Sequence, residues 1–293
     1  MASNLSEIEQ ESQLLNIIRN LDYTPAWSAS NYPQLLEKIY LLNQKLPKKK
    51  KIRLIPSDMK FDWYQCLTIQ QYKDFDNIPE RDTLIADNII YWYNTQTTKK
   101  KALVILNFRH SFLVNTHWGT DTNEVHHNVG KYLEEALDDK VASVYLNGLA
   151  YPIEYGKNEL IQEGKWDAYF SIARKENIGF DFKKTPFGTC KFDLTPYGYS
   201  VDSLTYENVF TGMIFYEPIN NHLMQNGWNN FIDSTFSTEF IRRVNIYTKA
   251  TSGQKIDSFE ISNYINEINQ ISSYKYDNIE SLLNKIDSIK NDL

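Results

Sequence analysis

The sequence predicts an α/β protein in which helices flank a layered sheet of mostly parallel central strands, with an irregular loop layer over the strand ends. Two observations support this prediction: short apolar runs alternate with helical patterns, and the hydrophobic fraction of 42% and charged fraction of 23% are typical of globular chains. At 293 residues the chain is long enough to bury a substantial core. We therefore expect a single α/β domain over residues 1–293.

Three apolar runs predict the strands of this sheet, at residues 52–55, 102–106 and 141–146. The run 102–106 is apolar at every position, which fits a parallel strand that is covered on both faces. Between the runs, apolar residues at helical spacing predict helices over 81–93 and 124–137. This repeat of strand and helix forms the expected core over residues 48–150.

Further elements are expected on both sides of the core. Residues 1–47 form N-terminal helices, because apolar residues recur at helical spacing over 6–21 and 32–42. Residues 151–250 supply additional strands, helices and covering loops: a helix over 164–174, a loop layer over 179–206, a strand over 208–216 and a helix over 234–247. The segment 251–293 is helical, and its last helix, over 278–293, either docks on the body or pairs with a second copy as a homodimer.

Composition excludes several classes of partner. A net charge of −6 argues against a general binder of nucleic acid, and the four lysines at 48–51 are better explained as a solvated entry to the first strand. Cys66 and Cys190 are too few and too far apart for a zinc knuckle or a disulfide framework. No membrane span or signal peptide is visible, so we expect a cytoplasmic location, or a secreted or periplasmic one if a leader has been removed.

Ligands collect outside the carboxyl ends of parallel strands, so the loops after the first two runs are the expected site. The first loop carries Asp58 and Asp62, and the second carries His110. Two carboxylates and an imidazole can hold one divalent metal ion or share general acid and base work. The alternative is that Asp58 caps the next helix, Asp62 is a surface charge and His110 packs against a carbonyl group.

Basic residues near these loops are candidates for substrate binding. Arg81 opens a predicted helix, where its charge opposes the helix dipole unless a carboxylate or an anionic substrate group compensates it. The dipole alone explains the acidic Glu80 and Asp82. Residues 120–122 are expected to cap the helix over 124–137, and a loop before that cap places His117 over the strand ends. The expected substrate-binding residues are Asp62, Trp63, Arg109 and His117.

Residues 80–89 (ERDTLIADNI) and 101–110 (KALVILNFRH), followed by 130–137 (GKYLEEAL) and 141–148, resemble the erythromycin esterase-like and haem-binding-uptake (ChaN/TIKI) superfamily. The resemblance covers about a third of the chain, over residues 50–150. It implies an α/β fold with a deep polar site for histidine-assisted or metal-assisted hydrolysis, or for ligand binding. His110 matches the histidine of the second motif and Arg81 the arginine at the helix start. The chain departs from the family at 57–63, which holds no histidine, and at Asn107, which replaces a glycine.

Two functions follow from these residues. The first is a hydrolase whose catalytic residues are His110, Asp58 and Arg81, with one divalent metal ion possible at Asp58, Asp62 and His110. In this hydrolase Arg81 holds a substrate carboxylate or stabilises an oxyanion. The alternative is a non-catalytic protein that binds a small molecule, a carbohydrate or haem, with Trp63 and Trp118 as the walls of its cleft. The missing histidine of the first motif favours the binding protein, whereas the set of acid, arginine and histidine favours the hydrolase. We expect the hydrolase, with a small molecule as its substrate.

Overall fold

A computed structural model describes residues 7–21, 23–25, 31–78, 80–98, 101–118, 121–149, 158–173, 177–194, 199–200 and 204–292. The chain forms two compact units, each assembled from separate segments. Unit 1 comprises Met1–Pro56, Lys60–Pro79 and Met224–Tyr274. Unit 2 comprises Ser57–Met59, Glu80–Leu223 and Lys275–Leu293. Each unit is described separately below.

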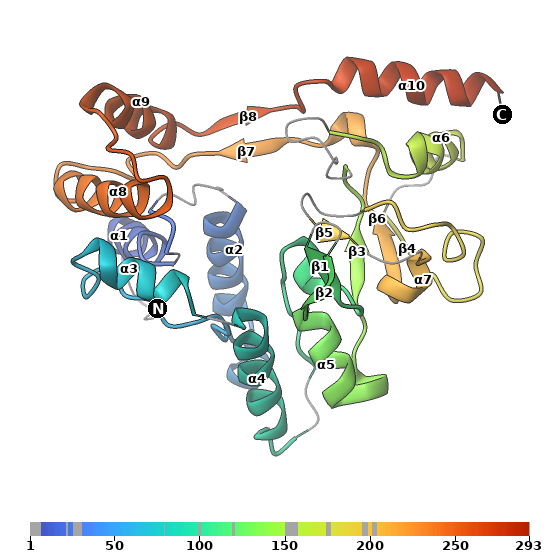
Figure 1. The fold of residues 1–293 in the computed structure, drawn as a ribbon, viewed down its shortest axis with the longest axis horizontal. Helices are drawn as coiled ribbons and strands as arrows, with labels where there is room; N and C mark the ends of the chain where they lie inside the picture. Colours follow the sequence, from blue (N-terminus) through green and yellow to red (C-terminus); the bar gives the residue numbers. More distant parts are fainter. Residues whose placement is uncertain are drawn as a thin grey trace. The chain divides into compact units, whose positions relative to one another are not determined.

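Unit 1 is mainly helical (Figure 1). Its α-helices are α1 (Glu7–Ile18), α2 (Asn31–Lys45), α3 (Ile69–Asp76), α8 (Ser237–Thr251) and α9 (Ser258–Ile268). The lysine run forms a short 3-10 helix, η1 (Lys48–Lys50), with no buried residue. Strands β7 (Met224–Asn226) and β8 (Ser272–Tyr274) pair as an antiparallel ladder.

Helix caps and aromatic packing define unit 1 locally. Thr68 begins α3 with a capping box, in which its hydroxyl accepts from the amide of Gln71. Asp257 begins α9 in the same way. One core cluster is centred on the fully buried Phe240 of α8, and another contains Tyr72 of α3. Helix α3 therefore starts at a residue that favours a cap and buries the face that carries Tyr72.

Unit 2 contains the remaining elements that the structure describes. Its helices are α4 (Arg81–Asn94), α5 (Val129–Leu137), α6 (Lys165–Ile172), α7 (Tyr206–Val209) and α10 (Ile279–Asp292), with 3-10 helices η2 (Phe108–Ser111), η3 (Asp138–Lys140), η4 (Ile161–Gly164) and η5 (Ile219–Asn221). Its strands are β1 (Thr116–Trp118), β2 (Asp121–His126), β3 (Val144–Leu146), β4 (Ile178–Asp181), β5 (Tyr199–Ser200) and β6 (Gly212–Phe215).

Two small sheets lie within unit 2. One has the order β2-β1-β5 and is antiparallel throughout. The other has the order β3-β6-β4, in which β3 runs parallel to β6 and β4 antiparallel to it (Figure 1). Its apolar side chains join a large aromatic core that includes Phe182, Tyr206 and Phe215, each fully buried. Residues expected as a covering loop layer thus contribute a strand and part of this core.

The combination of many helices with small mixed sheets is compatible with the α/β class expected from the sequence. The predictions of strands at 52–55 and 102–106 were wrong, because neither segment forms a strand or joins a ladder between described strands. Leu103 is 89% exposed and Leu54 is 52% exposed. A run of apolar residues predicts a strand only if a partner strand accepts its hydrogen bonds, and the run itself does not specify that partner.

Most helix predictions agree with the structure, namely those that correspond to α1, α2, α4, α6, α8 and α10. The helix expected over 124–137 begins later, because residues up to His126 belong to β2 and the helix starts at Val129. Its N-cap is Asn128 rather than the residues at 120–122. The side chain of Asn128 makes no capping hydrogen bond, because it contacts Arg109 and the carbonyl of Val114 instead.

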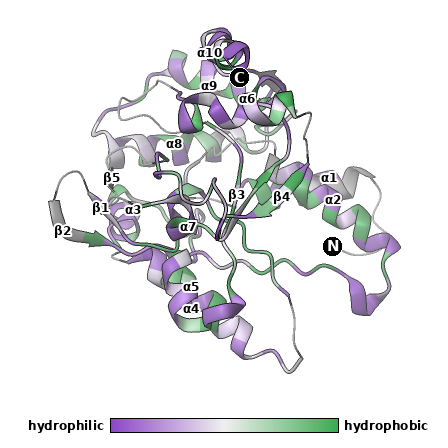
Figure 2. Cartoon of the chain, turned by 90° about the vertical axis from the view of Figure 1, so that its right-hand side faces the viewer, coloured by the Kyte–Doolittle hydropathy of each residue, from purple (hydrophilic) through white to green (hydrophobic). Residues whose placement is uncertain are grey.

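The C-terminal helix α10 docks on its own unit. Leu282 and Ile286 are buried in a cluster with Leu160 and Ala168, so the apolar face of α10 packs in the region of α6. Figure 2, in which α10 is seen close to end-on, shows hydrophobic and hydrophilic residues together in this helix, as expected for a helix with one packed face. A homodimer through this helix stays a prediction. No helix in the described ranges is long and apolar enough to cross a bilayer.

Candidate functional site

The imidazole of His110 lies against a carboxylate. His110 belongs to η2, and its Nδ1 lies 2.8 Å from Oδ2 of Asp82 in the first turn of α4. Asp82 is 7% exposed, whereas the side chain of His110 is 22% exposed. A carboxylate at Nδ1 favours the tautomer that carries its proton there, which leaves Nε2 as the acceptor. The pair can therefore act as a base oriented by an acid.

Arg109 joins the same carboxylate and fixes its surroundings. Its Nη1 lies 3.3 Å from Oδ2 of Asp82 and donates to Oδ1 of Asn128 at 2.9 Å. Asn128 is fully buried, and its own Nδ2 donates to the carbonyl of Val114 at 2.6 Å. The network thus connects α4, η2 and the start of α5, so the positions of Asp82, Arg109 and His110 are linked.

Asp58 and Arg81 form a bidentate ion pair. The Nε of Arg81 donates to Oδ1 of Asp58 at 2.9 Å, and Nη2 contacts Oδ2. Both side chains are partly exposed, at 32% for Arg81 and 49% for Asp58. An arginine at a helix start was expected to need a compensating carboxylate or anionic group. Asp58 is that carboxylate. The side-chain amide of Asn88, about two turns further along α4, donates to the carbonyl of Ser57 at 3.0 Å and holds this loop.

The start of α4 gathers most of the predicted catalytic residues. Arg81 and Asp82 are consecutive, so one side chain binds Asp58 while the next binds His110 and Arg109. The expected route was different, because two parallel strand ends were to bring Asp58 and His110 together. In the structure a helix terminus connects them instead, and the segments before Asp58 and His110 lie outside the described ladders.

Three further predicted residues lie elsewhere. Asp62 and Trp63 belong to unit 1, where Asp62 accepts from the amide of Tyr64 at 2.9 Å and Trp63 is 1% exposed. The ring of Trp63 stacks on Tyr72 in the core, so its own chain covers it. His117 lies in strand β1, opposite Val125, rather than in a loop, and its Nδ1 is buried without a hydrogen-bond partner in the described residues. The side chain of Trp118 lies outside the described part.

The residues proposed as ligands of a divalent metal are engaged by other side chains of their own unit. Both oxygens of Asp58 contact Arg81, and Nδ1 of His110 is taken by Asp82. Asp62 binds Gln65 and Tyr64 in unit 1. Within the ranges that the structure describes, no three side chains of His, Cys, Asp or Glu come together as metal ligands. These contacts do not fit a metal site at the three residues.

Sequence reasoning missed Asp82 and Asn128, which hold the centre together. An aspartate in a first helical turn is already explained by the helix dipole, so its tertiary role left no separate signal. Asn128 was not identified as the N-cap of α5, which would have placed it beside the loop that carries Arg109. The one available signal was that Asp82 directly follows Arg81 in the segment 80–89 that carries the resemblance.

Comparison of this chain with models of protein families, with curated proteins and with solved structures finds no match. The resemblance of residues 50–150 to the erythromycin esterase-like superfamily therefore stays a prediction from the sequence.

Proposed function

We propose that this protein is a hydrolase of small esters in which His110 is the general base and Asp82 orients it. The observation that carries the proposal is the 2.8 Å contact between His110 Nδ1 and Asp82 Oδ2. A base of this kind needs a second group on the opposite nitrogen, because that group fixes the tautomer and stabilises the imidazolium. The partial exposure of His110 gives a substrate access to the ring.

The proposed reaction takes place at Nε2 of His110, the ring nitrogen that does not contact Asp82. Nε2 of His110 takes a proton from a water molecule while the water oxygen attacks the ester carbonyl carbon. The resulting imidazolium is held by Asp82, and Nε2 then returns the proton to the leaving alcohol as the bond between the carbonyl carbon and the alcohol oxygen breaks. The products are a carboxylic acid and an alcohol, and no other reactant is consumed.

Two arginines supply positive charge to this region of unit 2. Arg109 contacts Asp82 directly, and Arg81 precedes Asp82 on α4. Guanidinium groups stabilise the oxyanion that develops on an ester carbonyl and bind substrate carboxylates in a bidentate manner. Arg81 is paired here with Asp58 and Arg109 with Asp82, so these four side chains carry no net charge. Asp58 then acts by positioning Arg81, through their ion pair, rather than by binding a metal ion.

The finer fold expectation, a layered and mostly parallel sheet, also belongs to this proposal. It is supported by the parallel pairing of β3 with β6, where Val144 lies opposite Gly212 and Leu146 opposite Ile214. The segments at 52–55 and 102–106 do not form strands of this sheet. The catalytic proposal does not depend on them, because its contacts lie at α4, η2 and α5.

Steady-state hydrolysis of a panel of 4-nitrophenyl esters, with neutral and anionic acyl groups, tests the proposal. We expect wild-type protein to hydrolyse at least one ester, and both His110→Ala and Asp82→Asn to lower kcat by about 100-fold or more, because base catalysis is lost in each. KM should change little, since neither residue is expected to dominate substrate binding.

Asp87→Asn is the matched control, because Asp87 lies on the same helix and is exposed. This variant should keep wild-type activity. Wild-type kcat in His110→Ala or Asp82→Asn would contradict the assignment, and so would the absence of turnover over the whole panel. Metal analysis of the same preparations should give no stoichiometric metal. A metal lost together with activity on Asp58→Ala would replace this mechanism with a metal-assisted one.

A further inference from the structure

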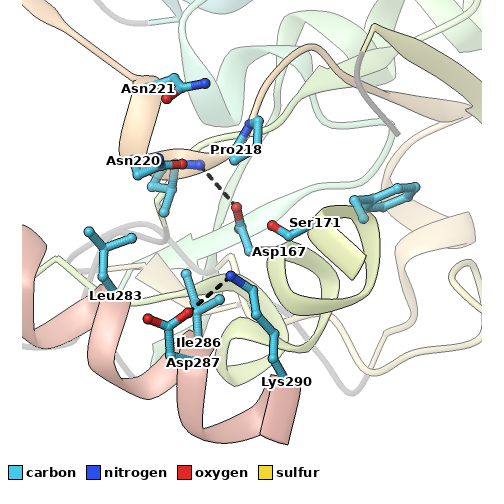
Figure 3. Close-up of a pocket in the computed structure, with 11 residues that line it drawn as sticks. Asp167, Ser171, Pro218, Asn220, Asn221, Leu283, Ile286, Asp287 and Lys290 are labelled. Carbon is cyan, nitrogen blue, oxygen red and sulfur yellow. Dashed lines mark hydrogen bonds and ion pairs between the residues drawn. The ribbon is translucent and has the colours of Figure 1, made fainter. Parts of the chain in front are cut away.

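A cavity of about 540 Å³ lies in unit 2, away from His110, among α6, η5 and the last turns of α10 (Figure 3). None of the residues predicted from the sequence as site residues lines it. Its volume is within the range of about 300 to 1,000 Å³ that is typical of small-molecule sites. Segments 167–171, 218–221 and 283–290 supply the walls, so residues far apart in the sequence converge on one space.

The cavity contains a buried carboxylate that is only half satisfied. Asp167 on α6 is 7% exposed, and its Oδ1 accepts from the amide of Ile219 at 3.0 Å. The other oxygen, Oδ2, is not among the fully buried unpartnered atoms of the described residues, so it is accessible from the cavity. Burial raises the pKa of Asp167, while the charge of Lys290 opposes that rise. A carboxylate kept in such a place costs stability unless a cation binds it.

The nearest ammonium is committed to a different partner. Nζ of Lys290 lies 3.0 Å from Oδ1 of Asp287, three residues earlier on α10. Figure 3 shows the Lys290 ammonium between Asp287 and Asp167, with its ion pair drawn to Asp287. The charged residues of the lining are two carboxylates and one ammonium, which leaves one negative charge in excess. The cavity is thus complementary to one positive charge.

The other lining residues indicate which chemical group the ligand carries beside its positive charge. Pro218 and Leu283 are partly exposed and provide apolar surface in the same lining as Asp167, above the buried Ile219 and Ile286. We propose that this cavity binds a small organic ammonium ion with an apolar body, whose ammonium group contacts Asp167 and whose body packs on Pro218 and Leu283. A zwitterion fits less well, because its carboxylate would add a negative charge to a cavity whose single ammonium is already paired. This site is independent of the hydrolytic centre proposed above.

Isothermal titration calorimetry of the full chain with 2-phenylethylamine and hexylamine, at matched ionic strength, tests the proposal. We expect both amines to bind at one site and to raise the melting temperature. The neutral analogues 2-phenylethanol and hexanol, and the zwitterion phenylalanine, should bind about tenfold more weakly or worse, because each lacks an uncompensated ammonium. Equal binding of amines and alcohols would overturn the proposal, and so would no binding of either amine.

Two variants of lining residues should act in opposite directions. Asp167→Asn should weaken amine binding by about tenfold or more, because it removes the charge and keeps an oxygen that can accept from Ile219. Lys290→Gln should tighten amine binding severalfold, because it removes the competing cation. Weaker binding in Lys290→Gln would overturn the proposal even if Asp167→Asn failed to fold.

Asp181→Asn is the matched control, since Asp181 is an exposed residue of β4 in the same unit and does not line the cavity. Amine affinity in this variant should equal that of wild-type protein. A loss in Asp181→Asn as large as that in Asp167→Asn would show that the amines respond to net charge alone, and would overturn the site. A selective loss in Asp167→Asn supports it.

Discussion

Single carboxylates stabilise this protein through several weak partners at once, as Asp233 shows. Its Oδ1 accepts from the amides of Thr235 and Phe236, each at 2.9 Å, just before α8 begins. The pKa of Asp233 is lowered to about 2. The hydrogen bond from the Thr235 hydroxyl lowers this pKa most, and burial raises it by less. Hydrogen bonds from Arg19 and from the Phe236 amide lower it further. The ionised form of Asp233 therefore favours the folded state.

Asp233→Asn should destabilise the protein in a manner that depends on pH. A carboxylate whose pKa is depressed on folding contributes stability above its unfolded pKa, near 3.8, and loses it as the pH falls toward about 2. We expect the variant to be less stable at pH 7 by about 1 kcal/mol, because asparagine keeps an acceptor oxygen but loses the charge that pairs with Arg19. Urea unfolding of both proteins between pH 7 and pH 2 measures this difference, which should vanish at the acid end. A constant difference would contradict the assignment.

Four residues of the candidate centre, Asp58, Arg81, Arg109 and His110, were predicted from the sequence. Asp82, which contacts both Arg109 and His110, was not. Arg81, Arg109 and His110 were identified because each is either energetically unfavourable at its position in the chain or of a residue type that is common in catalytic sites. Asp82 did not, because an acidic side chain in a first helical turn is ordinary. Its partner His110 lies 28 residues further along the chain, and local patterns do not report contacts of that separation.

Among the elements, the packing of α5 on η2 controls the candidate centre. A Cβ atom at Gly130 in α5 would lie 2.5 Å from the carbonyl oxygen of Ser111 and 2.6 Å from that of Phe112. These are the residues that directly follow His110. Only glycine lets the helix approach this turn so closely, and the same approach brings Asn128 to Arg109.

Gly130→Ala should therefore destabilise the protein and reduce ester hydrolysis together. Helix propensity alone would make alanine more stable than glycine by about 1 kcal/mol, whereas overpacking against the carbonyls costs about 1 to 3 kcal/mol. We expect a net loss of stability in chemical denaturation and a lower kcat, because His110 moves relative to Asp82.

Gly148→Ala serves as the control, since the nearest atom to its Cβ would be the Tyr145 hydroxyl at 3.4 Å. This variant should change stability and activity much less than Gly130→Ala. A stabilised and fully active Gly130→Ala protein would show that α5 does not constrain the centre.

Elements with a local signal were predictable, and elements that depend on a distant partner were not. Apolar spacing identified α4, α6 and α10, because a helix satisfies its own backbone hydrogen bonds. Strands need a neighbour. The run 141–146 contains β3, which pairs with β6 about 70 residues later in the sequence. The run 102–106 is more uniformly apolar, but it joins no ladder between described strands. Pairing of this kind cannot be read from one segment alone.

For the whole molecule, the main feature is that neither compact unit is a continuous piece of chain. Unit 2 takes its last segment, Lys275–Leu293, from beyond a long segment that belongs to unit 1. This last segment contains α10, whose Leu282 and Ile286 are buried at 7% and 2% exposure. The folding of unit 2 therefore requires residues from the end of the chain.

A chain that ends at residue 274 should fold less stably, although it keeps the entire Asp82–His110 region. Loss of the two buried side chains removes about 3 to 6 kcal/mol of apolar stabilisation and exposes Ile219. Chemical denaturation should show the loss, and a peptide of residues 275–293 added in excess should restore part of it. Unchanged stability after truncation would contradict the docking of α10. As a point control, Ser288→Ala on the exposed face of α10 should be nearly neutral.

The central claim is that Asp82 fixes the proton of His110 on Nδ1 and leaves Nε2 as the base. Nitrogen NMR of protein labelled with ¹⁵N-histidine measures this directly, because the two ring nitrogens differ in shift according to which one carries the proton. The chain has only five histidines, and His110→Gln assigns the signals. We predict the Nδ1–H tautomer for neutral His110 in wild-type protein, and a change of tautomer in Asp82→Asn. A wild-type His110 with its proton on Nε2, unaltered by Asp82→Asn, would contradict the account.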